Sequence, residues 1–460
     1  MKHNFSSSLK KKDFPLILLV AVLLSGGIIG ALVFDFSILI PIAVAGAFFF
    51  TLLFWRDPLM FLVCIIPFRM VFDFSGEFFF VRITDSLSLS LSQVIGVFVF
   101  GIGVLFFIKY FQRAAGSLKV MLPFWVLLAW AAASFFFSFS PSDTARDVLR
   151  VFDILALASM AFVFTQSRSD MKLILLAMLY SSVVPMLFGI WQYISGVGYS
   201  EEFTDIQRIY GTFGHPNVFG MYLFILIVFC FFFWKFFADT IRERIFALGL
   251  GVIAFFLIFL TLSRVSWAIL FLFFFVLGAL RFRKMVVPVV LIAMAVFLLV
   301  PSVQDRIMEL FTFSADSSVL WRINIWKDAT DQVFVWNKVW LGFGLDTFPV
   351  VVSEIHAASF GSDNAHNDFV KFFVEGGIVG LLVYIFWLGS FSVLFFRESV
   401  RKNLEMKDQE LFLFVLILLL SLVVASLSDA VFKSTPLQWL LWIFAGALLG
   451  LTQKEKYAKV

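Results

Sequence analysis

The chain has 460 residues, of which 62% are hydrophobic and only 14% are charged, and 66 of them are phenylalanine. A soluble domain carries about 25% charged residues, so this composition excludes a soluble globular protein and predicts an integral membrane protein. The net charge of +4 is small and gives no reason to expect a nucleic-acid partner. Cys64 and Cys230 lie inside apolar runs and suggest neither a redox site nor a metal site.

Apolar runs of about 20 residues, enough to cross roughly 30 Å of bilayer hydrocarbon as a helix, recur along the whole chain. The pairs of runs that meet near Asp35 and near Arg264 can be divided differently, so we predict an all-α polytopic fold with 12–14 transmembrane helices. The first run has no small-residue cleavage site, and we expect it to be an uncleaved span. The runs cover 15–34, 36–55, 58–72, 91–108, 120–139, 148–166, 171–194, 217–234, 245–262, 265–280, 285–301, 369–396, 411–428 and 436–451.

The basic residues predict an orientation, because Lys and Arg are retained on the cytoplasmic side. Most of the 35 Lys and Arg residues fall on one side when the runs alternate in direction, which predicts that both termini are cytoplasmic. We therefore divide the chain into an amino-terminal bundle of about eleven spans (1–301), a long extracytoplasmic loop (302–366) and about three carboxy-terminal spans (367–460). The loop 195–216 and the corner 261–264 also fall on the outer side.

The long loop contains one amphipathic run, residues 318–336. Such a helix either lies in the headgroup layer of the membrane or caps the bundle, and the sequence leaves both interpretations open. Its apolar residues at near-helical spacing are Leu320, Ile323, Trp326 and Val333, opposed by Arg322, Asn324, Asp328 and Asp331.

A histidine stands where the apolar run 369–396 begins. Asn364 or Asn367 can cap the incoming helix, and Asp368 suits its first turn. The helix dipole disfavours a protonated imidazolium at this position, so we predict that His366 is a neutral ring that can accept a proton. The alternative is a capping or solvated histidine without a chemical role.

Three arginines are predicted on the same outer side, namely Arg208, Arg264 and Arg322. An arginine at the centre of a membrane helix costs about 2.5 to 3.5 kcal/mol, so its retention indicates a partner or a role. Snorkelling to the interface is one explanation. A guanidinium fork also matches phosphate oxygens, and several forks beside a histidine and the glycine-rich turn of His215 and Asn217 favour anion recognition.

Other motifs restrict the chemistry. The sequence contains no P-loop, no His-Glu-x-x-His motif and no Cys/His cluster, so we predict no cofactor and no metal site. Asp363 and Asp368 flank His366 and are the weak alternative for a metal pair. Arg146 and Arg150, with Asp153 one turn deeper, predict a structural ion pair.

At this point the residues resemble a known family. The stretch 362–380 reads SDNAHNDFVKFFVEGGIVG and is similar to the His-Asn, nine residues, Gly-x-x-Gly pattern of the O-antigen ligase and O-antigen polymerase superfamily. The matching positions are His366, Asn367, Gly377 and Gly380. The segments RIYGTFGHPNVFGMYL, TLSR and WLGFGLDTF resemble other segments of that family in the same order.

The resemblance implies a metal-independent C-type glycosyltransferase at the outer face of the bacterial inner membrane. Its donor would be an undecaprenyl-diphosphate-linked glycan, and its acceptor hydroxyl would belong to the lipid A core, a growing glycan or a protein. His366 would be the base, and Arg208, Arg264 and Arg322 would bind the diphosphate. The supporting residues would be Asn367, Gly377, Gly380, His215 and Asn217.

Three alternatives remain open from the sequence. The residues do not separate a ligase from a polymerase, since both cleave the same donor. A flippase or transporter is less favoured, because such proteins keep ionisable residues near the bilayer centre and show internal repeats, and neither pattern stands out here. A membrane scaffold is the third alternative, but it gives no reason to gather His, Asn and Arg on one side.

Overall fold

The computed structural model describes residues 39–71, 80–84, 87–200, 207–308, 318–355, 364–402 and 404–458. The fold is all-α, as predicted, apart from two short two-stranded ribbons. The predicted first span, 15–34, lies outside the described residues. The first half of the chain forms helices α2 (Leu39–Arg56), α3 (Pro58–Val71), α5 (Leu91–Lys109), α6 (Phe111–Leu118), α7 (Leu122–Ser134), α8 (Pro141–Phe164), α9 (Arg168–Tyr180), α10 (Val183–Ser195) and α11 (Pro216–Phe236).

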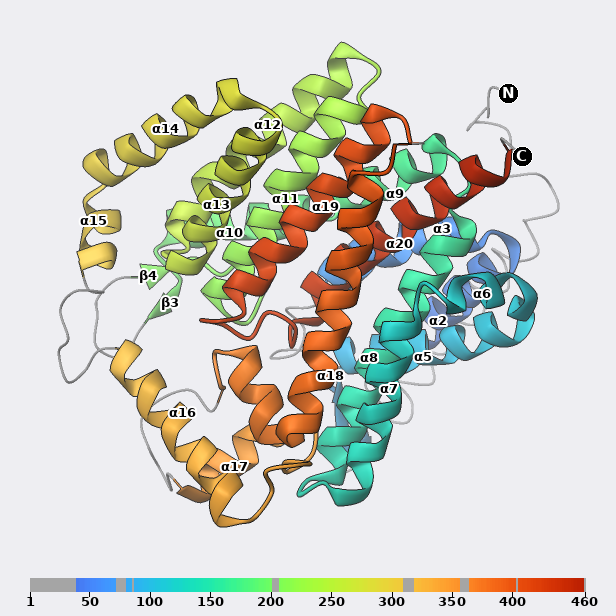
Figure 1. Ribbon diagram of the computed structural model, residues 1–460, viewed down its shortest axis with the longest axis vertical. Coiled ribbons are helices and arrows are strands. Elements are labelled where there is room, and N and C mark those ends of the chain that lie inside the picture. The colour runs from blue at the N-terminus through green and yellow to red at the C-terminus, as the bar shows by residue number, and fades with distance from the viewer. Residues whose placement is uncertain are drawn as a thin grey trace.

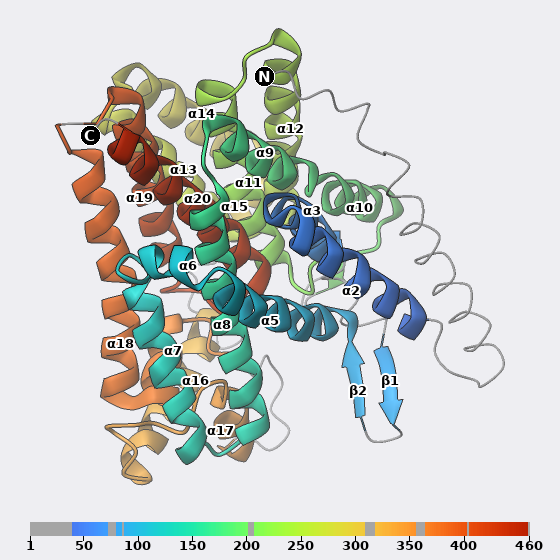
Figure 2. The ribbon, with the colours of Figure 1, turned by 90° about the vertical axis from the view of Figure 1, so that its right-hand side faces the viewer.

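The described residues of the second half form nine more helices, and short 3₁₀ turns cover Phe135–Phe137 and Arg283–Met285. These helices are α12 (Ile241–Leu260), α13 (Arg264–Leu280), α14 (Val286–Leu299), α15 (Pro301–Met308), α16 (Ser318–Val335), α17 (Phe348–Ile355), α18 (Asp368–Ser399), α19 (Met406–Ala425) and α20 (Thr435–Ala458). Strands β1 (Phe80–Thr84) and β2 (Leu87–Ser90) pair antiparallel, as do β3 (Tyr199–Ser200) and β4 (Gln207–Arg208). The β1–β2 hairpin extends from the start of α5 (Figure 2).

The protein is a multi-pass membrane protein with seven helical segments long and apolar enough to cross a bilayer in its described part. An eighth span results if α6 and α7, which meet at 97°, count as one. Every apolar run of the sequence other than 15–34 contains a helix. Several of these helices are short or bent, and α8 carries Asp147, Arg150 and Asp153, so the described residues form fewer full-length spans than 12–14. The seven segments are Leu91–Lys109, Arg168–Ser195, Pro216–Phe236, Ile241–Leu260, Asp368–Ser399, Met406–Ala425 and Thr435–Thr452.

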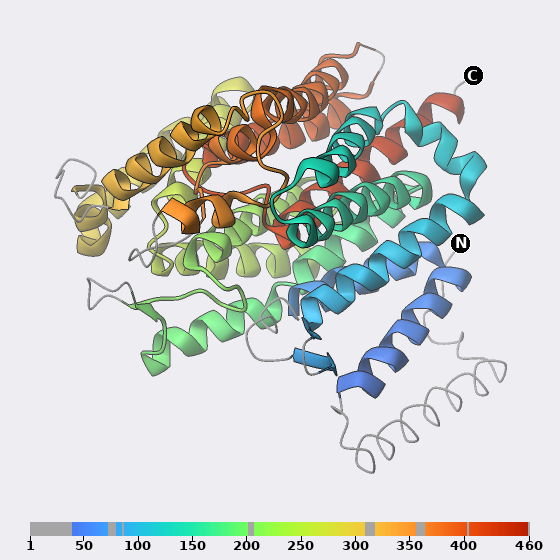
Figure 3. The ribbon, with the colours of Figure 1, turned by 90° about the horizontal axis from the view of Figure 1, so that it is seen from below.

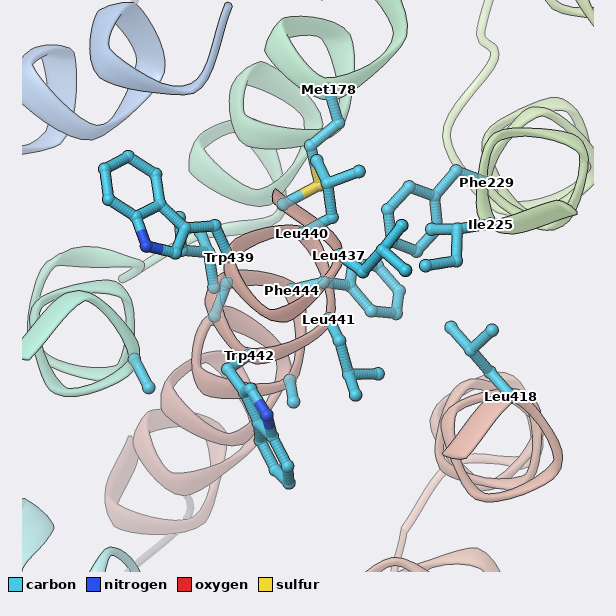
Figure 4. Close-up of a cluster of buried hydrophobic side chains, with 14 of the residues drawn as sticks. Met178, Ile225, Phe229, Leu418, Leu437, Trp439, Leu440, Leu441, Trp442 and Phe444 are labelled. Atoms are coloured by element: carbon cyan, nitrogen blue, oxygen red, sulfur yellow. The ribbon is translucent and has the colours of Figure 1, made fainter. Parts of the chain in front are cut away.

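Helix α20 lies at the centre of the bundle. In its apolar part 94% of the residues are buried, and 83% are buried in α11. Both helices are apolar on every side, which is the pattern of a helix surrounded by other helices. Figure 4 shows Trp439, Trp442 and Phe444 of α20 pointing in different directions, with Phe444 facing Phe229 of α11. The last helix of the chain is therefore part of the core.

Ion pairs join the helix ends at one end of the bundle. Glu410 at the start of α19 lies 3.3 Å from Lys235 Nζ and 2.9 Å from Arg281 Nε, at the carboxyl ends of α11 and α13. Asp408 accepts a 2.7 Å hydrogen bond from Arg168 at the start of α9. Because α11 has 21 residues, about 30 Å long, its amino end with His215 belongs to the opposite end of the bundle.

The amphipathic run of the long loop is a helix, as predicted, and it covers the start of α18. Helix α16 packs on α17 and α18 (Figures 1 and 3). Its buried face consists of Ile325, Ala329 and Val333, whereas Ile323 is 47% exposed. The predicted apolar face was therefore wrong at Ile323, because the helix turns its i, i+4, i+8 row toward its neighbours. This packing supports the capping interpretation.

Candidate functional site

The site begins with the residues that start α18. Asn367 is the helix cap, since its Oδ1 accepts hydrogen bonds from the backbone N–H groups of Phe369 (2.9 Å) and Val370 (3.1 Å). Its amide group donates to the Leu427 carbonyl at 3.0 Å, which ties the cap to the loop between α19 and α20. His366 precedes the cap in a left-handed backbone conformation, with φ of +46°. Such a φ is uncommon outside glycine, and the cap and the loop hold it in place.

The imidazole of His366 is paired with a carboxylate. Nδ1 lies 3.2 Å from Oδ1 of Asp429, and the two residues are 8% and 5% exposed. An ionised carboxylate only accepts, so Nδ1 carries the hydrogen and Nε2 is left with its lone pair. Sequence reasoning missed Asp429, which stands directly after the apolar run 411–428. A carboxylate at the end of a span was the available signal, but no spacing connects it to His366.

A second set of hydrogen bonds reaches Asp429 from the start of α11. The Asn217 amide donates to Asp429 Oδ2 at 2.7 Å, and Arg208 Nη2 donates to Asn217 Oδ1 at 2.7 Å. Arg208 Nε also donates to the Thr261 carbonyl at 2.8 Å, and Arg208 is 6% exposed. We call the series Arg208, Asn217, Asp429 and His366 the His366 relay. It brings together three segments that are far apart in the sequence.

The charges around the relay shift two pKa values. Burial alone would raise the pKa of the Asp429 carboxyl, but the hydrogen bond from His366 and the positive charge of Arg322 hold that pKa well below its usual range. Burial lowers the pKa of His215 to about 4; Arg208 adds to this effect, whereas Asp429 opposes it. The site therefore holds an ionised Asp429 and a neutral His215.

His215 is the cap residue of α11. Its Nδ1 accepts a 3.1 Å hydrogen bond from the backbone N–H of Asn217, which places the ring hydrogen on Nε2. Its ring centroid lies 6.1 Å from that of His366, and the ring of Tyr199 lies 5.2 Å away. The two predicted histidines are therefore neighbours, as are the supporting residues Asn217 and Asn367 around them.

The three predicted arginines take different places. Arg322 of α16 is half-buried and donates through Nη1 to the Ser428 carbonyl at 2.9 Å, directly before Asp429. Arg208 belongs to the relay. Arg264 is the first residue of α13, three positions after the Thr261 carbonyl that Arg208 binds.

The glycines of the motif permit a close approach of chain segments. A Cβ on Gly376 or Gly380 would lie 2.3 Å or 2.5 Å from the Trp130 ring, so these glycines allow α18 to pack closely on α7. The helix surface is not continuous, however, because Gly377 breaks α18 with φ of +61°. The freed backbone groups pair with the segment before α17: Gly344 N–H donates to the Glu375 carbonyl and Ile378 N–H to the Val339 carbonyl, both at 2.8 Å.

A group of charged residues lies on the other side of the α18 start. Lys371 Nζ lies 2.6 Å from Glu375 Oε2 and 3.5 Å from Asp346 Oδ1, and Lys433 Nζ lies 2.9 Å from the same Asp346 oxygen. We call these four residues the Lys371 cluster. Together with Asp147, Arg150 and Asp368, its two lysines contribute polar groups to a cavity of about 40 Å³.

Two smaller predictions concern the same region. Arg146 and Arg150 form ion pairs, as predicted, but with Asp143 and Asp147, each one turn before its arginine. Of the weak metal pair, Asp363 lies outside the described residues, and Asp368 accepts the Phe432 N–H at 2.9 Å. Among the residues that the structure describes, no group of three or more His, Cys, Asp or Glu side chains is arranged to hold a metal ion.

Comparison with known proteins matches one part of the chain to a family. Residues 248–385 match the family model described as O-antigen ligase (Wzy_C). This membrane protein carries an O-antigen ligase domain. No curated protein matches the chain. The O-antigen ligase match runs from α12 into α18 and includes Arg264, Arg322 and His366, and the family implies a ligase-type or polymerase-type activity on lipid-linked glycans.

Proposed function

We propose that this protein transfers a glycan from an undecaprenyl-diphosphate carrier to an acceptor hydroxyl, with His366 as the general base. The observation that carries the proposal is the pairing of His366 with Asp429 inside the relay. His366 lies within the residues that match the O-antigen ligase family. Family membership supports the reaction class, and the geometry supports the choice of residue.

The proposed chemistry follows from the pairing. The acceptor oxygen attacks the anomeric carbon of the donor while Nε2 of His366 takes the hydroxyl proton. The bond between the sugar and the phosphate oxygen breaks, and the diphosphate leaves with the bonding electron pair. Asp429 stabilises the imidazolium that forms, so the base becomes stronger as the transition state develops. A positioned general base contributes a factor of about 100 to 10,000 in rate.

The departing diphosphate needs positive charge on the same face. Arg322 fits this role best, since it lies beside Asp429 and is only half-buried. Arg264, at the corner where α13 begins, is the second proposed diphosphate ligand. Preorganised guanidinium groups bind the diphosphate that the donor already carries and stabilise the further charge that it gains as it leaves, so they affect both the donor KM and the rate of transfer. The proposal requires neither a cofactor nor a metal ion.

We also propose that both termini are cytoplasmic and that the site faces the periplasm or exterior of a bacterial inner membrane. The predicted cytoplasmic residues Lys235 and Arg281 share one end of the bundle, and the His366 relay lies at the other. The rule that basic residues stay inside then sets the direction. The domain division 1–301, 302–366 and 367–460 remains part of this proposal.

Reconstitution tests the function directly. The purified protein is placed in vesicles with a lipid-linked glycan and three acceptors: lipid A core, free glycan and a protein hydroxyl. We expect the wild type to transfer sugar without added nucleotide, and the acceptor that gains sugar distinguishes a ligase from a polymerase. A flippase would move the lipid without cleaving it.

The variant His366→Ala should lose transfer while still binding the donor. Asp331→Asn, an exposed change on α16 at the same end of the molecule, is the matched control and should keep full activity. Normal product from His366→Ala would remove His366 from the mechanism.

A further inference from the structure

We propose that Arg208 is a positioning residue, which acts through Asn217 and Asp429 to set the His366 imidazole, and not a ligand of the diphosphate. This inference rests on the proposed function, because it assigns a second role within the same site. It is carried by the direction of each hydrogen bond in the His366 relay.

The guanidinium of Arg208 is anchored within the fold. Nε and Nη2 form one edge of the planar fork, and this is an edge that grips a phosphate or carboxylate with two parallel hydrogen bonds. Here Nε donates to the Thr261 carbonyl at 2.8 Å and Nη2 donates to Asn217 Oδ1 at 2.7 Å. The edge therefore serves two acceptors of the protein, and the residue is 6% exposed.

The hydrogen bond from Arg208 fixes the orientation of the Asn217 amide. A guanidinium only donates, so the amide oxygen must face Arg208, and the amide NH₂ group must then face Asp429. The NH₂ group lies 2.7 Å from Asp429 Oδ2. A flipped amide would set NH₂ against the guanidinium and the amide oxygen against the carboxylate. Arg208 therefore determines which end of Asn217 reaches Asp429.

The Asn217 amide in turn orients the Asp429 carboxylate, and the carboxylate orients the His366 imidazole. Oδ2 accepts from Asn217, and Oδ1 accepts from the Ala430 N–H at 2.8 Å and faces His366 Nδ1 at 3.2 Å. With both oxygens held, the plane of the carboxylate is fixed, and so is the ring that donates to it. Without Arg208 the amide can flip, and Asp429 loses its hydrogen bond from Asn217 and can rotate away from His366.

A double-mutant cycle between Arg208→Gln and Asn217→Ala tests the relay in the reconstituted enzyme. We expect each variant to lower kcat by about 10- to 100-fold with the KM for the lipid-linked donor changed less than about 2-fold, and the double variant to lose no more than the worse single variant. Arg208→Lys should not rescue kcat, since one ammonium cannot reproduce the planar two-donor edge. Arg322→Gln is the contrasting variant and should raise the donor KM.

Two outcomes would overturn the proposal: additive losses of kcat in the double variant, or a donor KM raised about 10-fold by Arg208→Gln with kcat unchanged. The second outcome would assign Arg208 to diphosphate binding. Asn217→Asp covers the case in which Arg208→Gln does not fold. This variant strengthens the bond to Arg208 but cannot donate to Asp429, so a relay predicts lost kcat, and a purely structural anchor predicts normal kcat.

A second readout does not depend on transfer. The rate at which diethylpyrocarbonate modifies His366, followed by mass spectrometry, should change in the same direction in Arg208→Gln and Asn217→Ala. If this rate changes while the wild type transfers no sugar, the proposed function fails and the relay stands. If transfer depends on His366 but the modification rate and kcat are unchanged in both variants, the relay fails.

Discussion

Two sets of buried polar residues flank the start of α18, and they differ in how their hydrogen bonds end. In the Lys371 cluster each charge faces an opposite charge, and the 2.6 Å pair of Lys371 and Glu375 is 6% and 0% exposed at the side chains. In the His366 relay Arg208 donates to Asn217, and the Asp429 carboxylate accepts from both Asn217 and the His366 imidazole. A closed set of pairs stabilises the fold, whereas an ordered series orients one reactive atom.

Because of this difference, substitutions in the Lys371 cluster and in the His366 relay should affect different measurements. Removing one partner of a buried ion pair typically costs about 3 to 5 kcal/mol of stability, because the remaining charge is left uncompensated. Removing a partner of a catalytic base changes the rate, since the stability of the fold depends little on where one ring points. Variants in the two sets should therefore separate into those that lose stability and those that lose activity.

The largest effect is expected in the relay. Asp429→Asn should lower kcat by about 100- to 10,000-fold, because the imidazolium loses its counter-charge during proton transfer. The measurement is sugar transfer by reconstituted protein. Asp408→Asn is the matched control, a buried aspartate at the other end of α19 that pairs with Arg168, and it should keep activity. Equal activity of Asp429→Asn and the wild type would erase the distinction between the two sets.

The second-largest effect is expected from a substitution in the Lys371 cluster. Lys371→Met should lower the free energy of unfolding by about 3 to 5 kcal/mol, because Glu375 is left buried without its cation. The double variant Lys371→Met/Glu375→Gln should recover much of this loss, as Gln keeps an acceptor for the Phe348 N–H at 3.1 Å. Thermal unfolding in detergent gives the stability, and transfer per folded molecule should stay normal. A stable but inactive Lys371→Met would contradict this assignment.

The helix break at Gly377 in α18, on the same side as the Lys371 cluster, provides a third test. Gly377→Ala should destabilise the protein by about 2 to 4 kcal/mol, because φ is +61° and the added Cβ would lie 2.4 Å from the carbonyl carbon of Trp340. Gly389→Ala in the same helix is the matched control, since nothing lies within 4 Å of its added Cβ. That change should be neutral or stabilising by up to about 1 kcal/mol. Similar melting temperatures for both variants would disprove the strain at Gly377.

The smallest effect is the pH dependence of stability that we expect from His215, next to the His366 relay. The pKa of His215 falls from its ordinary 6.5 to about 4 on folding. Between these values the unfolded chain binds more protons, so stability is fully present above about pH 6.5 and falls as the pH drops toward 4. Melting temperatures of the wild type and His215→Gln between pH 7.5 and 4.5 measure this. An identical pH dependence in both proteins would show that another group is responsible.

Local patterns in the sequence predicted the class of fold and much of the site. Hydropathy located nearly all of the described helices, since burial in a bilayer depends on the composition of about 20 neighbouring residues. The cap of α18 was also predictable, because Asn367 bonds to residues two and three positions ahead of it. The same local reasoning found His366, Arg208, Arg322, His215 and Asn217 one by one.

Only the tertiary structure decided how these residues pair. Asp429 meets His366 across 63 positions and Asn217 across 212, and no local periodicity encodes such separations. The buried face of α16 and the break at Gly377 likewise depend on what packs against them. Sequence alone determined which residues enter the membrane and where helices begin, because those preferences act within a few turns. The packing of loops at one end of the bundle determined which polar residues pair, because that is where distant segments come within hydrogen-bonding distance.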